Sequence, residues 1–199
     1  MGKPIDLAGF EAVFRDSPDP WKTRTSRDER VKREAILRAL GTGRRARVLE
    51  LASGNGSNSS GVLSRSLRLH ACDGAEAAVA LTRAALGESR RGARADVTVA
   101  RLPGGVPADP VEAVVIAEVL YYLPARDVRR LGQELARRLQ PGGRLVLAHH
   151  GVDFHDTASR PQLCHTHLLE GVSDEGRNVL GRRTFARTSR WRVERVDVA

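Results

Sequence analysis

The feature that most constrains the fold is a regular alternation of short apolar runs with longer amphipathic stretches. The runs are bounded by Gly, Pro or Asp, as is typical of buried strands, and the stretches between them have helical spacing. Such alternation indicates repeated βα units, and hence an α/β fold with a parallel sheet and helices on both faces. We expect strands near 46–51, 68–73, 96–102, 111–118 and 144–149.

Further elements complete this sheet. Helices are expected at 28–40, 74–86 and 124–139. Weak alternation after residue 181 predicts a terminal antiparallel hairpin, which brings the expected sheet to seven strands. Before the first helix, an irregular segment containing Pro and Asp is expected to lie over the sheet edge as a lid.

Composition favours one globular domain in the cytoplasm. The chain has 199 residues, of which 41% are hydrophobic and 4% aromatic, and this length suits one α/β domain. No apolar run approaches the ~20 residues that cross a bilayer, and the start has no secretory signal, so no membrane association is expected. Cys72 and Cys164 are too few for a disulfide framework.

The net charge of +9 raises the possibility of a nucleic-acid partner. However, nearly all of the positive charge is arginine, spread along the chain and not gathered on one helix with interleaved aromatics. An RNA substrate therefore stays as the second hypothesis.

The segment 48–60 places a Gly-x-Gly turn between a buried strand and a helix start. Gly54 and Gly56 flank Asn55, and glycine permits both a tight turn and close approach of a ligand to the backbone. Four residues earlier, Glu50 is placed to bind the ammonium of a methionine moiety and to favour a nearby sulfonium. The Gly-x-Gly alone is weak evidence, because a purely structural turn has the same pattern.

Two acidic residues at later strand ends strengthen the ligand hypothesis. Asp73 closes the second strand about twenty residues after the glycines, where a carboxylate binds ribose hydroxyls or caps the next helix. Glu118 ends the fourth strand and is followed by apolar and aromatic residues, including Val119 and Tyr122. Ligands bind at this carboxyl edge in parallel sheets.

In this order, and with Leu139-Gln140-Pro141-Gly142-Gly143 before the fifth strand, these motifs resemble class I S-adenosylmethionine-dependent methyltransferases over 46–150. The resemblance implies a Rossmann-like fold, with a cap and helix in 1–45, a cofactor-binding core in 46–150 and a substrate-side segment in 151–199. A dinucleotide-binding protein and a noncatalytic module remain alternatives, although Ser59 replaces the third glycine of a dinucleotide motif. The expected contacts to S-adenosylmethionine are Trp21, Arg24, Glu50, Gly54, Asn55, Gly56, Asp73, Arg101, Leu102, Glu118 and Val119.

A narrower resemblance is to the nodulation protein S group, carried by 19–26, 117–123 and 147–149. Members of that group methylate an amine of a deacetylated chitooligosaccharide. The resemblance implies that 21–26 caps the cofactor, with Trp21 packed on it and Arg24 paired with its carboxylate. The expected acceptor is an amine or hydroxyl of a small molecule, such as an aminosugar or oligosaccharide. His150 stands where that group has an aromatic residue, and the chain end is arginine-rich.

Five of the six histidines lie between residues 149 and 167, namely His149, His150, His155, His165 and His167. At least His149 or His150 is expected to face the substrate, because both follow the fifth strand. An amine acceptor must lose a proton, so we expect Glu118, Tyr122 and His149 to be catalytic. A metal bound by His165 and His167 with His149 or His155 is the alternative, and no metal is expected because the spacing does not match known metal-dependent methyltransferases.

Overall fold

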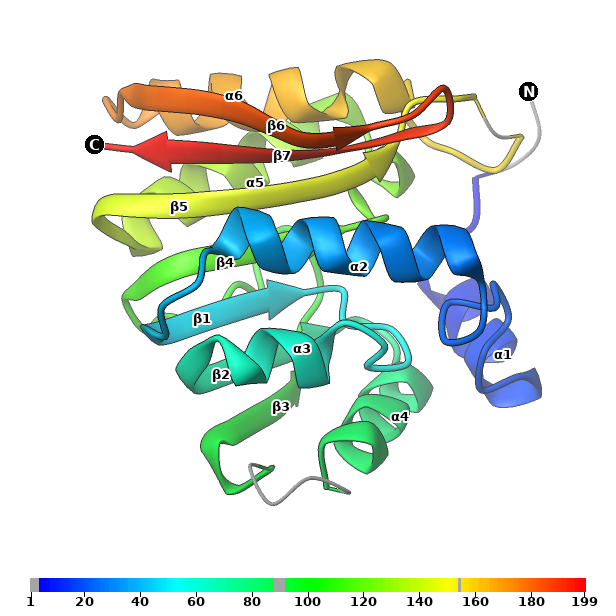
Figure 1. Cartoon of the computed structure of the whole chain (residues 1–199). Coiled ribbons are helices and arrows are strands. Elements are labelled where there is room, and N and C mark those ends of the chain that lie inside the picture. The colour runs from blue at the N-terminus through cyan, green and yellow to red at the C-terminus, as the bar shows by residue number, and fades with distance from the viewer. Residues whose placement is uncertain (1–3, 88–91, 154) are drawn as a thin grey trace.

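The computed structural model describes residues 4–87, 92–153 and 155–199. Seven strands form one sheet in the order β3-β2-β1-β4-β5-β7-β6 (Figure 1). The strands are β1 (Arg45–Leu51), β2 (Ser66–Asp73), β3 (Ala95–Val99), β4 (Val111–Ala117), β5 (Leu139–His150), β6 (Val179–Arg187) and β7 (Trp191–Val198).

The central part of the sheet is parallel and its end is antiparallel. β1 pairs in parallel with β2 and β4, β2 with β3, and β4 with β5. β7 runs antiparallel to both β5 and β6. The predicted fold class, including the terminal hairpin, is therefore confirmed. Parallel pairing brings the carboxyl ends of β1, β2, β4 and β5 to one edge of the sheet.

Helices cover both faces of the sheet. The α-helices are α1 (Leu7–Asp16), α2 (Arg27–Leu40), α3 (Ser59–Ser64), α4 (Glu76–Gly87), α5 (Ala125–Arg138) and α6 (Cys164–Asp174), and the short 3-10 turns are η1 (Gly92–Arg94), η2 (Leu120–Tyr122) and η3 (Pro161–Leu163). α2 and α3 pack with Val48 on one face, whereas α5 and α6 pack with Leu49 on the other. Adjacent strand residues point to opposite faces, so both faces are apolar.

Four elements differ from the sequence expectations, and one of them is β5, which begins at Leu139 and not near residue 144. α1 was not expected; its apolar residues Leu7, Phe10 and Phe14 pack on the start of α4 at the carboxyl edge. α6 was also not expected, and β3 ends at Val99, before the Leu102-Pro103 peptide, which is cis. Within the described residues, no helix has the length and apolar character needed to cross a membrane.

Candidate active site at the carboxyl edge

The turn after β1 uses left-handed backbone at three alternate positions. Ala52, Gly54 and Gly56 have φ values of 54°, 56° and 75°. A Cβ on Gly56 would lie 3.0 Å from Thr82 Cα of α4, so this position needs glycine for packing as well as for conformation. Ala52 is the residue that sequence reasoning missed, because its side chain gives no sign of a left-handed conformation.

Asp73 joins the glycine turn to the start of α4. Its Oδ2 accepts the Gly54 N–H at 2.9 Å and its Oδ1 accepts the Ala75 N–H at 2.9 Å. Burial raises the pKa of this carboxyl. Asp73 therefore makes the local capping interaction and also stands beside the glycines, so the two roles considered for it are compatible in geometry.

Glu50 is a buried carboxyl that lacks one partner. The residue is 2% exposed, and among the described residues its Oε2 and the nearby Ser59 Oγ have no hydrogen-bond partner. Burial, together with the charge of Asp73, raises the pKa of Glu50 to about 7. A ligand ammonium would satisfy the orphaned oxygen and favour the ionised form. The residues at this edge therefore fit the methionine end and the ribose of the expected cofactor.

The segment between α1 and α2 is fastened to the glycine turn through Asn55. The Asn55 amide nitrogen donates to Pro18 O and to Asp19 Oδ1 at 3.1 and 2.9 Å. Arg24 Nη2 donates to the Asn55 carbonyl oxygen at 2.8 Å. The predicted lid thus lies directly over the turn. Asn55 and Arg24 anchor the lid over the turn. This role is additional to the cofactor contacts that the sequence predicts for both residues.

Aromatic rings of α1 and of the lid extend this cover of the turn toward the end of β4. Trp21, 47% exposed, packs edge-on against Phe14 with ring centroids 5.4 Å apart. Phe14 also lies 3.5 Å from the position that a Cβ on Gly54 would take. Phe10 meets Tyr122 at 4.9 Å between centroids. Trp21 therefore packs on α1, and Tyr122 contacts Phe10 of the same helix.

Glu118 is the centre of a polar cluster immediately after β4. Its Oε1 accepts from Lys32 Nζ at 2.5 Å, and its Oε2 accepts from Tyr121 OH at 2.5 Å and from His150 Nδ1 at 2.9 Å. Lys32, 2% exposed, also donates to Glu29 Oε1 at 2.7 Å. Glu118 has φ of 55°, a strained conformation that is concentrated at functional sites. Lys32 and Glu29 gave no signal in the sequence because α2 brings them from far along the chain.

The cluster keeps Glu118 ionised. Burial opposes ionisation, but the hydrogen bond from His150 and the charge of Lys32 outweigh it and lower the pKa of Glu118. Burial and the charge of Asp156 raise the pKa of Tyr122 to about 12. Glu118 is therefore a permanent anion, which suits it to orient and attract charged groups more than to accept a proton.

The two histidines at the end of β5 point in different directions. His149 is fully buried, and its ring nitrogens meet His165 Nε2 at 3.0 Å and Leu120 N at 3.3 Å. His150 is half-buried and lies beside Glu118. The structure thus corrects the expectation that His149 is catalytic, because strand alternation turns its side chain into the core under α6 and leaves His150 as the more accessible of the two. His167, one of the alternative metal ligands, instead pairs with Glu170 on the surface of α6.

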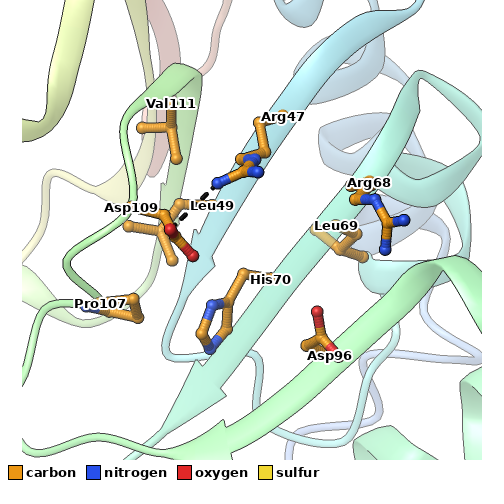
Figure 2. A pocket seen from close by; sticks show the side chains of 9 residues that line it. All are labelled: Arg47, Leu49, Arg68, Leu69, His70, Asp96, Pro107, Asp109 and Val111. Carbon is orange, nitrogen blue, oxygen red and sulfur yellow. Dashed lines mark ion pairs between the residues drawn. The ribbon is translucent and has the colours of Figure 1, made fainter.

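The two residues predicted to contact the cofactor after β3 lie in different surroundings. Arg101 is exposed, and Leu102 packs against the apolar core. A separate cavity of about 140 Å³ lies on the sheet. It is lined by Arg47, His70, Asp109 and neighbours from β1, β2, β3, β4 and the segment before β4 (Figure 2). None of the predicted site residues lines this cavity. Val119 precedes η2 and packs against the core beside Glu118.

Comparison with known proteins identifies the class of enzyme. A family model described as a methyltransferase domain matches residues 48–143, which include the glycine turn, Asp73 and Glu118. Residues 48–143, just under half of the chain, are thus similar to a methyltransferase domain. No curated protein matches the chain by sequence.

Solved structures of similar fold support the same class. N-methyltransferase NodS from Bradyrhizobium japonicum WM9, in complex with S-adenosyl-L-homocysteine, has a TM-score of 0.76 and 18% identity, covering 96% of this chain and 97% of that chain. A Pseudomonas syringae protein assigned as a methyltransferase is 29% identical, covering 85% of this chain and 98% of that chain, with a TM-score of 0.69. A structure of the complex between the Haloferax volcanii Trm112 methyltransferase activator and a protein assigned as a methyltransferase also matches. The identity is 18%, the match covers 94% of this chain and 96% of that chain, and the TM-score is 0.69.

These matches confirm the predicted Rossmann-like methyltransferase fold and S-adenosylmethionine as the cofactor. They favour methyl transfer over the dinucleotide-binding and noncatalytic alternatives. The methyltransferase therefore acts on a methyl acceptor. The side chains around Glu118 indicate the chemical class of that acceptor.

Proposed function

We propose that this methyltransferase transfers the methyl group to an amine of a small molecule. The observation that carries the proposal is the arrangement of Glu118 and Glu29 around the single ammonium of Lys32 at the carboxyl edge. Two carboxylates around one cation leave a net negative charge, and the Glu118 and Glu29 side chains are 25% and 22% exposed. Such a site attracts an ammonium more strongly than a neutral hydroxyl or a phosphate.

His150 is the residue suited to take the proton. Because the Glu118 carboxylate accepts and does not donate, the 2.9 Å contact puts a proton on His150 Nδ1 and makes Nε2 the basic nitrogen. Glu118 orients the imidazole, as a carboxylate does for a histidine base. When bound, S-adenosylmethionine would supply a methyl group on a positively charged sulfur, and the deprotonated amine would bond to that methyl carbon while the sulfur leaves as the thioether of S-adenosylhomocysteine. In this role His150 replaces His149, and Tyr122 forms the aromatic wall between the cap and Glu118.

The acceptor that we favour is an aminosugar or another metabolite with one primary amine. The similarity to NodS, an N-methyltransferase by its name, agrees with an amine acceptor. The RNA hypothesis has weaker support. Five of the seven arginines between residues 177 and 195 bond acceptors within the chain, which leaves less of this basic segment for phosphates. They are Arg177, Arg182, Arg190, Arg192 and Arg195.

The test is methyl transfer from S-adenosylmethionine to a panel of aminosugar oligomers, their N-acetylated forms and RNA, with products identified by mass spectrometry. We expect a gain of one methyl group on the free amines only. Glu118→Gln should lower kcat/KM about 100-fold while the affinity for S-adenosylhomocysteine changes little. Glu112→Gln, near the start of β4 and bonded to Ala46 N away from the cluster, is the matched control. Methylation of the N-acetylated sugars or RNA alone, or full activity of Glu118→Gln, would refute the proposal.

A further inference from the structure

We propose that His149, His165 and Glu194 form a buried hydrogen-bonded relay that fixes the turn after β4 and thereby positions Glu118 and Tyr121 for the acceptor. The proposal rests on the function proposed above, because it concerns the acceptor side of that site. The three residues come from β5, α6 and β7, and all are buried.

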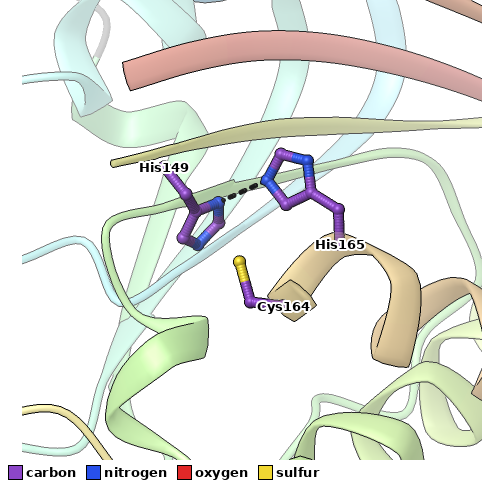
Figure 3. A group of neighbouring side chains, drawn as sticks. All are labelled: His149, Cys164 and His165. Carbon is purple, nitrogen blue, oxygen red and sulfur yellow. Dashed lines mark hydrogen bonds between the residues drawn. The ribbon is translucent and has the colours of Figure 1, made fainter. Parts of the chain in front are cut away.

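The relay is continuous from the terminal hairpin to the turn. His165 Nδ1 lies 2.5 Å from Glu194 Oε2, and His165 Nε2 lies 3.0 Å from His149 Nδ1. His149 Nε2 lies 3.3 Å from the Leu120 amide nitrogen. Figure 3 shows the two imidazoles facing one another from β5 and α6, with the Cys164 side chain beside them.

One assignment of protons satisfies every member. Burial opposes the ionisation of Glu194, but hydrogen bonds from His165 and Arg182 outweigh it and lower the pKa to about 2, so the carboxylate only accepts. His165 must then carry its proton on Nδ1 and accept on Nε2. His149 must likewise donate from Nδ1 and accept the Leu120 N–H on Nε2. Burial lowers the pKa of both histidines, which keeps the two rings neutral as this pattern requires.

A metal site is the competing explanation of the same residues. One potential ligand atom from each of His149, Cys164 and His165 lies within 4.8 Å of the others. A metal held by His149 Nδ1 and His165 Nε2 would displace the shared proton and leave His149 with its N–H facing the Leu120 N–H. Two donors would then oppose one another in the core. Burial also raises the pKa of Cys164 to about 12, which disfavours the thiolate that a metal needs. The hydrogen bonds therefore favour the relay.

The relay acts on the residues that meet the acceptor. Leu120 is the first residue of η2, two residues after the strained Glu118. Tyr121, the next residue, donates its hydroxyl to Glu118 and packs edge-on against the His149 ring at 5.8 Å between centroids. A non-glycine residue at positive φ is strained and persists only where its surroundings hold it. The bond to Leu120 is one such restraint, so His165 and Glu194 are positioning residues that act through His149.

The first test is nitrogen NMR of the imidazoles in the full chain bound to S-adenosylhomocysteine. We expect neutral, Nδ1-protonated rings for both His149 and His165. A charged ring, a proton on Nε2 of either ring, or zinc that co-purifies and requires these histidines would overturn the proposal. This readout needs no acceptor, so it stands apart from the test of the proposed function.

The second test separates positioning from folding. Glu194→Gln should lower kcat about tenfold or more, because small misplacements of reacting groups are costly, with the dissociation constant of S-adenosylhomocysteine within about twofold. Glu170→Gln is the matched control, because it removes the carboxylate of the surface pair with His167 on α6. The acceptor is whichever compound the unaltered enzyme methylates. Unchanged kcat in Glu194→Gln, or an equal loss in Glu170→Gln, would overturn the proposal.

Discussion

Replacing Glu50 by glutamine should stabilise the ligand-free protein while weakening its binding of cofactor. Glu50 is buried with an orphaned Oε2, and burial raises its pKa from 4.5 to about 7. A carboxyl with a raised pKa in the folded state contributes stability that is present below the unfolded pKa. That stability is lost as the pH rises through the folded value. Glutamine keeps the shape and carries no charge, so it escapes this loss.

The size of the effect follows from the shift. The change from 4.5 to about 7 corresponds to about 3 kcal/mol once the carboxyl is ionised in both states. The advantage of Glu50→Gln in the free energy of unfolding should therefore be about 3 kcal/mol near pH 8.5, and less than about 1 kcal/mol near pH 5. Binding should move the opposite way, because the ligand ammonium loses an anionic partner, and the dissociation constant of S-adenosylhomocysteine should rise about tenfold or more.

The assay is urea unfolding of both proteins at the two pH values, with calorimetric titration of S-adenosylhomocysteine. Near pH 7 the unaltered enzyme should also release protons on binding, because the ammonium favours ionised Glu50, and Glu50→Gln should lose this release. Glu76→Gln removes a carboxylate from the exposed start of α4 and serves as the control. A stability difference that does not grow with pH, or unchanged cofactor affinity, would refute the reasoning.

Two further predictions follow from the backbone and the buried ion pairs. Ala52→Gly should raise the free energy of unfolding by about 1 kcal/mol, because it relieves the left-handed φ of 54°, whereas Ala80→Gly, exposed within α4, should lower it by about 1 kcal/mol. Thermal melts of both variants check this, and destabilisation by Ala52→Gly would contradict it. Lys32→Met should cost about 3 kcal/mol in urea unfolding, because it leaves Glu118 and Glu29 without their shared cation. Arg187→Met on exposed β6 should stay within about 0.5 kcal/mol, and equal effects of the two would refute the role of Lys32.

Much of the parallel core was predictable because its signals are local. Apolar runs placed β1, β2, β4 and the hairpin within a few residues of their observed ends, and Gly54, Gly56 and Asp73 stand together because they end neighbouring parallel strands. α1 was missed although it has local signals too, because Asp6 caps its first turn and Leu7, Phe10 and Phe14 lie at helical spacing on the face that packs against α4. Tertiary packing, and not local propensity, stabilises a helix of this length.

The sequence by itself determined the βα order, the glycine turn and the acidic residues at the strand ends, because each depends on spacing along the chain. Only the tertiary structure decided which histidine meets Glu118. His149 and His150 are neighbours on β5, and a strand sends neighbours to opposite sides, but nothing in the local pattern says which side α6 covers. Packing of α6 buries His149 with His165 and leaves His150 beside Glu118. Lys32 reaches the same carboxylate only because α2 lies across the sheet, a contact between residues 86 positions apart.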